Sequence, residues 1–360
     1  MTGMDQPGMD RPQSGSSLGL RGTPGGGGAG SSTARLKLAH FLRARELGVG
    51  LALIVMCVAL SCTTDGFLSV LNLLNIGRQI SLLGIMAVGM TFVLTCGDVD
   101  LSVGSNYALS GIICGMLIDQ GWLLAPAIAA ALVCGLVIGL VNGLLSTYGR
   151  LPSLIATLGM LSVVRGGALI LTNGSPITVD LSSGGRPVTL NNFFAMGQGH
   201  LFGVIPMQLV FFVLIAILGW MILNFTNFGF RVFAVGGSPK AARVSGISVE
   251  KVKIAAFMLL GVLCAFAGIL SLSFLPSSQA GQTGLGLELD VIAATIIGGT
   301  SLSGGEGTIV GTILGVLIVG VLRNGLILLG ISPFVQVLMI GAVIIGAVAI
   351  DRWTVNRGAT

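Results

Sequence analysis

Charged residues are scarce in this chain of 360 residues: they make up 9% of it, against 53% hydrophobic residues. Soluble domains carry about 25% charged residues, so a soluble globular protein is excluded. The apolar residues gather in runs that can cross a hydrocarbon core about 30 Å thick, for which a helix needs ~20 residues. The composition therefore predicts an all-α, polytopic membrane protein.

Lysine is rare, and no lysine stands where an ATPase would need one. A P-loop requires a Gly-Lys-Ser/Thr end to bind phosphates. The only lysines, Lys37, Lys240, Lys251 and Lys253, follow Leu, Pro, Glu and Val. We therefore expect no enzymatic activity and no nucleotide bound by this chain.

Histidine and cysteine are also sparse. His40 and His200 are expected on opposite sides of the membrane, and the sequence contains no HExxH motif and no serine-nucleophile elbow. The six cysteines include no CxxC pair, so neither a disulfide framework nor a zinc site is indicated. We expect the cysteines to be small buried apolar side chains, and we expect no bound metal.

The apolar runs themselves predict about ten transmembrane helices. They lie at roughly 47–64, 79–96, 101–118, 122–146, 152–172, 207–225, 252–275, 286–302, 308–329 and 333–350. The third and eighth runs are the weakest, because each is short or interrupted by Gly, Ser or acidic residues.

Lysine and arginine near the ends of these runs set the orientation, because cytoplasmic connections carry an excess of both. With ten spans, the basic residues before the first span and after the fourth, sixth and tenth fall on one side, which is expected to be cytoplasmic and to hold both termini. The expected parts are a disordered cytoplasmic tail at 1–44, a membrane domain at 45–351 with an external loop at 173–206 and a cytoplasmic loop at 226–253, and a cytoplasmic tail at 352–360.

Two aspartates interrupt the apolar sequence in LTCGDVDLSVGSNYALSG, residues 94–111. Asp98 or Asp100 can cap the helix expected from Leu101, where free N–H groups and the helix dipole favour negative charge. The alternative is that one carboxylate lies on a translocation path or holds a gate. Glu288 and Asp290, near one end of the eighth run, are further candidates for the pathway or its gate.

Two arginines, Arg165 and Arg323, also interrupt apolar runs. Each can extend its guanidinium to the membrane interface or bind a helix-end carbonyl. The alternative is an ion pair with a carboxylate such as Glu288 or Asp290.

The cytoplasmic loop contains a short helix signal. Ser238 can cap a helix that has Pro239 at its first position, and KAARVSG then continues for two turns until Gly246. A basic loop on the cytoplasmic side needs no further role than orientation. Alternatively, the small side chains of Ala241 and Ala242, next to Lys240 and Arg243, fit insertion into a partner's groove.

Three blocks of sequence, taken in order, carry a family resemblance. They are GDVDLSVGS at 97–105, IATLGMLSVVRGGALILTNGSPI at 155–177, and AVGGSPKAARVSGISVEKVKI through ELDVIAATIIGGTSLSGGEGTIVGT at 234–312. From about residue 45 to 351 the chain resembles the permease subunit of ATP-binding-cassette sugar importers of the ribose type. The tail at 1–44 is not part of that pattern.

The resemblance implies a subunit that forms the pathway for a ribose-like monosaccharide by alternating access. The implied partners are an ATP-binding-cassette ATPase that holds ATP and Mg²⁺, an external solute-binding protein and a second permease copy, in the bacterial cytoplasmic (inner) membrane. Nucleic acid is not an expected partner. The residues alone leave open an ion-coupled secondary transporter of a small polar solute, which would place carboxylates deep in the membrane.

Two sets of candidate residues follow. The resemblance makes the short cytoplasmic helix the coupling helix that contacts the ATPase, formed by Ser238, Pro239, Lys240, Ala241, Ala242, Arg243, Val244, Ser245 and Gly246. Candidates for the translocation pathway or its gate are Asp98, Asp100, Asn106, Tyr107, Arg165, Glu288 and Asp290, with Asn142, Ser162 and Thr295 as further polar side chains.

Overall fold

The computed structural model describes residues 29–179, 187–332, 334–339, 341–342 and 345–346, with side chains from Glu46 onward except those of residues 187–190. The chain divides into two compact units, residues 1–43 and 44–360. The described part of the first unit, residues 29–43, is helical, although a disordered tail was predicted for residues 1–44. The second unit holds the remaining described helices and strands.

Seven helices among the described residues are long and apolar enough to cross a membrane. They are α1 (Ala29–Thr63, apolar from Glu46), α2 (Val70–Thr95), α4 (Leu124–Thr147), α5 (Ser153–Thr172), α7 (Met207–Phe225), α10 (Val249–Phe274) and α12 (Ile309–Leu328). Two shorter helices, α3 (Val103–Asp119) and α11 (Leu287–Ile297), occupy the third and eighth predicted spans. The prediction of a polytopic all-α membrane protein is confirmed. Part of the tenth predicted span, 333–350, lies outside the described residues.

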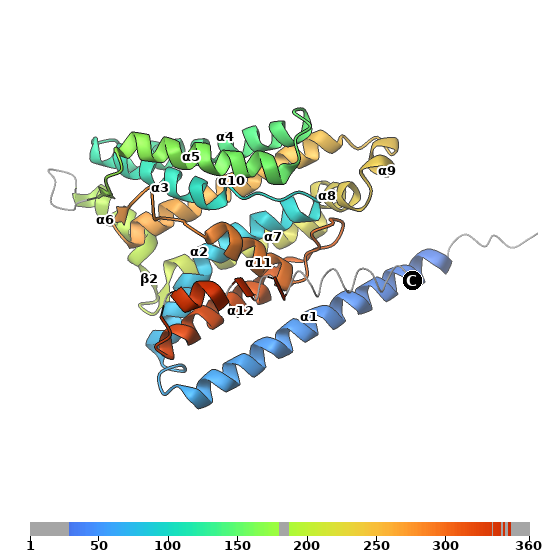
Figure 1. Ribbon diagram of the computed structural model, residues 1–360, viewed down its shortest axis with the longest axis horizontal. Helices are drawn as coiled ribbons and strands as arrows, with labels where there is room; N and C mark the ends of the chain where they lie inside the picture. Colours follow the sequence, from blue (N-terminus) through green and yellow to red (C-terminus); the bar gives the residue numbers. More distant parts are fainter. Residues whose placement is uncertain (1–28, 180–186, 333, 340, 343–344, 347–360) are drawn as a thin grey trace, which may run out of the picture. The chain divides into compact units, whose positions relative to one another are not determined.

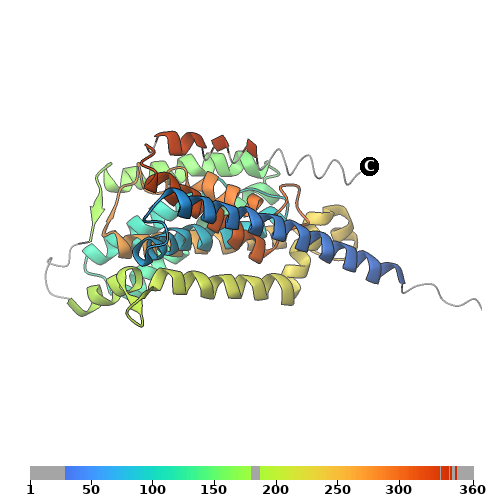
Figure 2. The ribbon, with the colours of Figure 1, turned by 90° about the horizontal axis from the view of Figure 1, so that it is seen from below.

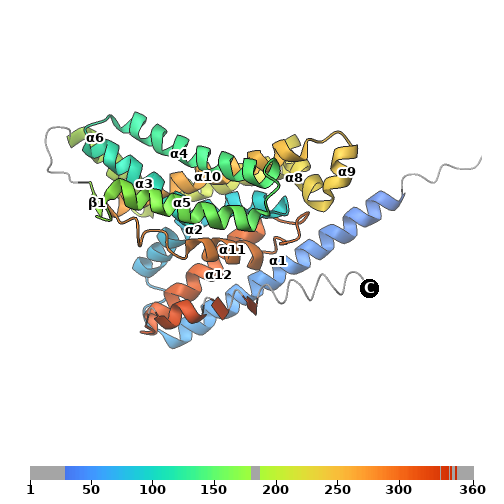
Figure 3. The same cartoon turned by 45° about the horizontal axis from the view of Figure 1, so that its top comes forward.

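Helix α10 is packed against α4, α3 and α2 (Figures 1 and 3). Glycines of α4 make the closest of these contacts possible. A Cβ at Gly135, Gly139 or Gly143 would collide with the backbone of α10, and the four-residue spacing places all three glycines on one face of α4. The abundance of glycine in the apolar runs therefore reflects close helix packing.

The third and eighth predicted spans are shorter helices, of 17 and 11 residues, and each follows a non-helical segment. Asn106, in the first turn of α3, donates a hydrogen bond to the carbonyl of Gly261, near the middle of α10. Residues 96–102, called the first interruption below, connect the end of α2 to the start of α3. The second interruption, residues 275–286, leads from α10 to α11, and Gly284 contacts Gly104 where α3 begins.

The two shorter helices, α3 and α11, run in opposite directions from this meeting point. After α11, Gly305 N–H donates to the Thr95 carbonyl at the end of α2, 2.9 Å away. At its other end, α3 approaches β1 (Ile177–Thr178), which pairs antiparallel with β4 (Ser277–Ser278). Broken spans of this kind are tolerated where the free backbone groups are buried in protein or line a water-filled cavity.

The two ends of the helix bundle carry different structures. At one end, α7 leads into α8 (Asn227–Gly237) and α9 (Pro239–Val244), as Figure 2 shows at the right of the view. At the opposite end, the predicted external loop contains α6 (Pro187–Gln198) and the hairpin of β2 (His200–Leu201) and β3 (Ile205–Pro206). The sequence did not predict α6.

Candidate coupling and translocation site

Helix α9 begins and ends where its sequence predicts. The Ser238 hydroxyl accepts a hydrogen bond from Ala241 N–H at 3.3 Å, Pro239 takes the first helical position, and Gly246 follows the helix with a φ of +81°. Most of α9 is exposed, and Val244 is 91% exposed. Ala242 is the exception, because it is buried within this chain. Ala242 therefore packs α9 against the rest of this chain. The surface open to a partner is formed by Lys240, Ala241, Arg243 and Val244.

Helix α8 directly precedes α9 in the chain, and it packs against the end of α2. It continues through the adjacent glycines Gly236 and Gly237, and it ends at Gly237. A Cβ at Gly236 would overlap the Thr95 carbonyl oxygen. Residue 236 must therefore be glycine for α8 to lie this close to α2. A shift of α8 would move the end of α2, which leads directly into the first interruption.

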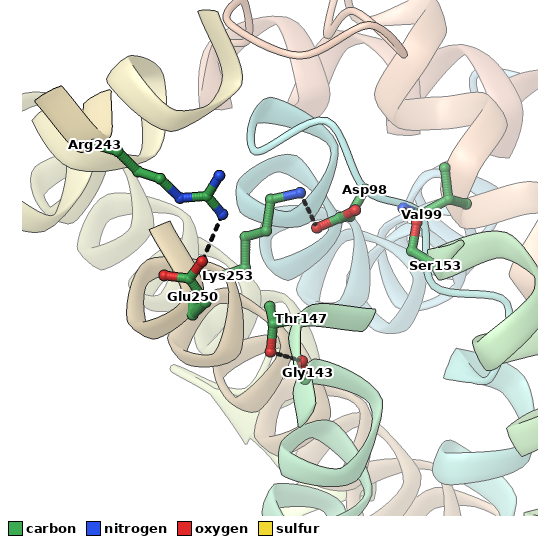
Figure 4. Close-up of polar contacts among 8 residues, drawn as sticks. All are labelled: Asp98, Val99, Gly143, Thr147, Ser153, Arg243, Glu250 and Lys253. Carbon is green, nitrogen blue, oxygen red and sulfur yellow. Dashed lines mark hydrogen bonds and ion pairs between the residues drawn. The ribbon is translucent and has the colours of Figure 1, made fainter. Parts of the chain in front are cut away.

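Two ion pairs link this end of the bundle to the first interruption (Figure 4). Arg243 of α9 lies 2.5 Å from Glu250 in the first turn of α10. One turn further along α10, Lys253 Nζ lies 2.9 Å from the Asp98 carboxylate. The first pair is largely exposed, whereas the side chains of Lys253 and Asp98 are only 19% and 10% exposed. The buried pair therefore joins α10 directly to the interruption.

Asp100 makes a second set of contacts inside the interruption. Its carboxylate accepts hydrogen bonds from the backbone N–H and the hydroxyl of Ser102, both at 2.7 Å, and from Asn142 Nδ2 of α4 at 3.0 Å. Helix α3 starts at Val103, two residues later than predicted, and Ser102 makes no side-chain capping bond. Asp100 thus binds the residue that precedes the helix.

The backbone of the first interruption is bound by α5. Val99 N–H donates to the Ser153 hydroxyl at 3.3 Å, a contact drawn in Figure 4, and Leu101 N–H donates to the Thr157 hydroxyl at 3.1 Å. Buried backbone donors must find such partners. The interruption is consequently attached to α4, α5 and α10 at once.

The second interruption is held by an arginine. Arg165 of α5 donates to the carbonyls of Ala280 and Thr283 at 2.8 and 2.5 Å. Among the described residues no ion pair joins Arg165 to Glu288, whose carboxylate instead accepts from Gly286 N–H at 3.3 Å. The guanidinium therefore donates to backbone carbonyls of a segment that has no helical hydrogen bonds of its own to occupy them.

Arg323 differs from Arg165, because its partner is a carboxylate. Its guanidinium on α12 lies 2.7 Å from Asp290 on α11. Asp290 is buried, while the side chain of Arg323 is 39% exposed. This pair ties α11 to α12.

The remaining polar candidates are dispersed. Asn106 joins α3 to the Gly261 carbonyl of α10, and Thr295 donates to the Val291 carbonyl one turn earlier in α11. Tyr107 is buried on α3, whereas Ser162 is exposed on α5. Asn106 and Thr295 therefore make contacts that support helices, and Ser162 lies apart from the interruptions.

Sequence reasoning missed three partners of the interruptions: Lys253, Ser153 and Thr157. Lys253 was counted only as a topological charge, and the two hydroxyl residues open α5 without any unusual pattern. A buried aspartate calls for a cation or several donors, so Asp98 signalled that a partner existed. The sequence did not indicate which residue it is.

Comparison with known proteins identifies relatives for most of the chain. Residues 72–348 match the family described as branched-chain amino acid transport system / permease component. The ribose import permease protein of Bacillus subtilis (strain 168) is 44% identical over 308 residues, which cover 86% of this chain and 93% of that protein. The ribose import permease protein of Escherichia coli (strain K12) is 40% identical over 302 residues, covering 84% and 92%.

A third relative is named for a different sugar. The L-arabinose transport system permease protein of Escherichia coli (strain K12) is 37% identical over 308 residues, covering 86% of this chain and 90% of that protein. No solved structure matches this chain. A family match that spans most of the chain, together with these relatives, establishes that this protein belongs to the branched-chain amino acid transport system / permease component family.

Proposed function

We propose that this chain forms the membrane pathway of an ATP-driven importer and that its cargo is a monosaccharide of the ribose or arabinose type. The observation that carries the proposal is the 44% identity to a ribose import permease over 93% of that protein's length. The L-arabinose permease is similar over 90% of its own length. We therefore assign a substrate class, a sugar, and name no single sugar.

The proposed assembly contains two copies of this chain, an ATPase that binds ATP and Mg²⁺, and an external solute-binding protein, in the bacterial inner membrane. Nucleotide-driven movement of the ATPase is transmitted through α9, which is short, basic and exposed at the end where the sequence predicts the cytoplasm. The helices then alternate between two packings that open the pathway to either side.

Uptake by the complete transporter tests the substrate class. Cells that express the transporter as their only route should accumulate at least one of ribose, arabinose and xylose, and the uptake should be lost when this chain is removed. Leucine uptake is measured in the same cells, because the family's description refers to branched-chain amino acids. Accumulation of leucine without any sugar would refute the proposal.

Substitutions on the exposed face of α9 test the coupling role. Ala241→Trp and Val244→Asp should lower sugar transport more than tenfold, because a bulky or charged side chain prevents the ATPase from seating on α9. ATP hydrolysis should then no longer respond to the loaded binding protein, while the chain remains inserted in the membrane. The matched control is Ala129→Trp at an exposed position of α4. Normal coupling in both α9 variants would show that the ATPase docks elsewhere.

A further inference from the structure

A cavity of about 240 Å³ lies between α2, α3, α11 and α12. Its polar lining comes from Gln79, Tyr107, Asp290 and Arg323, and its apolar lining includes Leu82 and Val319. The cavity therefore adjoins the start of both shorter helices, where α3 and α11 meet. None of the contacts described for α8 and α9 involves it.

The cavity lies between the two ends of α12. Arg323 is about 21 Å along that helix from its first residue, Ile309, and about 8 Å from its last residue, Leu328. The Arg323 side chain is nevertheless 39% exposed, and Gln79 beside the cavity is exposed as well. Charged and amide groups in a membrane-spanning segment face water or protein and avoid lipid. The exposed side of the cavity is therefore open to water or to another protein.

A second cavity provides the contrast. It measures about 280 Å³, lies between α7 and α12, and is lined by apolar side chains and Trp220, with no polar surface exposed to it. That lining suits lipid chains. Of these two cavities, the one with the ion pair offers hydrogen-bond donors and acceptors to a solute.

The Asp290–Arg323 pair has the chemistry that an uncharged polyol requires. The two groups neutralise one another at 2.7 Å, so neither an anion nor a cation is favoured. A carboxylate retains lone pairs that can accept from neighbouring hydroxyls, and a guanidinium has five N–H donors, only some of which one carboxylate can use. Gln79 adds both a donor and an acceptor, and the Tyr107 ring with the aliphatic side chains suits the C–H face of a sugar.

The geometry points to this cavity as a transit site for a monosaccharide, in which Asp290 and Arg323 bind sugar hydroxyls during passage. This inference rests on the proposed function. A neighbouring contact supplies its structural control: Asn324, next to Arg323, exchanges two side-chain hydrogen bonds with Asn72 of α2, at 3.0 and 2.8 Å. Both amides are buried, so this pair ties α12 to α2 without facing the cavity.

The test measures the discrimination between sugars at the permease itself. The transporter complex is reconstituted in vesicles, and the maximal rates for two pentose epimers are measured with saturating binding protein loaded with each. Asp290→Asn, Arg323→Gln and Gln79→Leu should change the ratio of the two rates at least threefold. Gln79 is exposed, so Gln79→Leu keeps the test informative if the ion-pair variants fold poorly.

The control variant carries Asn72→Leu together with Asn324→Leu, which removes both amides of the pair and also the bond from Asn72 to the Phe67 carbonyl. It should lower the thermal unfolding temperature and both rates, while their ratio stays constant. An unchanged ratio in all three cavity variants, with rates that fall only as stability falls, would overturn the transit site. A wild-type complex that moves neither sugar would instead overturn the proposed function.

Discussion

The two interruptions are similar in position but are held in different ways. The first, residues 96–102, is bound through two buried carboxylates and two backbone N–H groups to α4, α5 and α10. The second, residues 275–286, is bound through one arginine on α5 and a two-residue strand pair with β1. Its side chains include Leu275 and Leu285, which are 61% and 71% exposed.

This difference places the firmer attachment next to the coupling end. The end of α2 that leads into residues 96–102 lies against α8, and Asp98 pairs with Lys253 of α10, so movement of α9 reaches this interruption through buried contacts. Residues 275–286 begin at the opposite end of the bundle and extend to Gly104 at the start of α3, and they are held by Arg165 and the strand pair. We expect the first interruption to act as a stiff connection between the ATPase and the pathway, and the second to adapt to the solute.

The largest expected effect is the loss of the buried ion pair. Asp98→Asn leaves the Lys253 ammonium mostly buried without its partner, which destabilises by about 3 kcal/mol. The thermal unfolding temperature of the purified chain should fall, and transport should fall with it. Asp98→Asn combined with Lys253→Met should recover most of the stability, because no unpaired charge remains. If the double variant is as unstable as the single one, the pair does not hold the interruption.

The second largest effect is expected at the other interruption. Arg165→Met removes two charge-assisted hydrogen bonds to the carbonyls of Ala280 and Thr283 and should cost about 2 kcal/mol. Arg165→Lys preserves the charge and should cost less. The thermal unfolding temperatures of the two variants measure the loss of stability. A larger loss than that of Asp98→Asn would reverse the order of the two attachments.

A smaller effect is expected from the neutral bonds of the first interruption. Thr157→Val keeps the shape of the side chain but leaves Leu101 N–H without its acceptor, at a cost of about 1 kcal/mol. Thr172→Val on the same helix is the matched control, because that hydroxyl only donates to its own helix, to the carbonyl of Ala168. Equal unfolding temperatures for the two variants would mean that the bond to Leu101 contributes nothing.

The smallest effect is expected at the surface pair. Arg243 and Glu250 have side chains 57% and 30% exposed, and exposed ion pairs contribute little to stability. Arg243→Gln should therefore leave the unfolding temperature unchanged, although it alters the exposed surface of α9. Comparison with Asp98→Asn then separates stability from coupling. A marked loss of stability in Arg243→Gln would contradict this distinction.

The sequence predicted the parts of the structure that depend on local chemistry. Ser238, Pro239 and Gly246 set the bounds of α9, and the acidic residues at 98–100 and 288–290 marked the two broken spans. Helix α2 was predicted to start at residue 79, whereas it starts at Val70. Ser69 caps it by accepting from Asn72 N–H, and the Asn72 side chain is satisfied by Asn324 of α12. Polar residues that looked like a loop are thus part of a buried helix.

Long-range pairing could not be predicted from a single sequence. Nothing near Asp98 distinguishes Lys253 from the other lysines of the cytoplasmic loop. Arg165 and Arg323 looked alike in their apolar runs, yet one binds carbonyls and the other binds Asp290. The two environments arise from the folded arrangement of α5, α11 and α12. The candidate residues were found by their chemistry, and their partners became clear only in the structure.

The most direct test of the central claim is the energy source. Vesicles that contain this chain, its ATPase and the loaded binding protein should take up sugar when ATP is supplied inside, also after an ionophore has abolished every ion gradient. Vesicles with this chain alone should show no uphill uptake under a proton or sodium gradient. Uphill uptake by the chain alone, driven by such a gradient, would contradict the account.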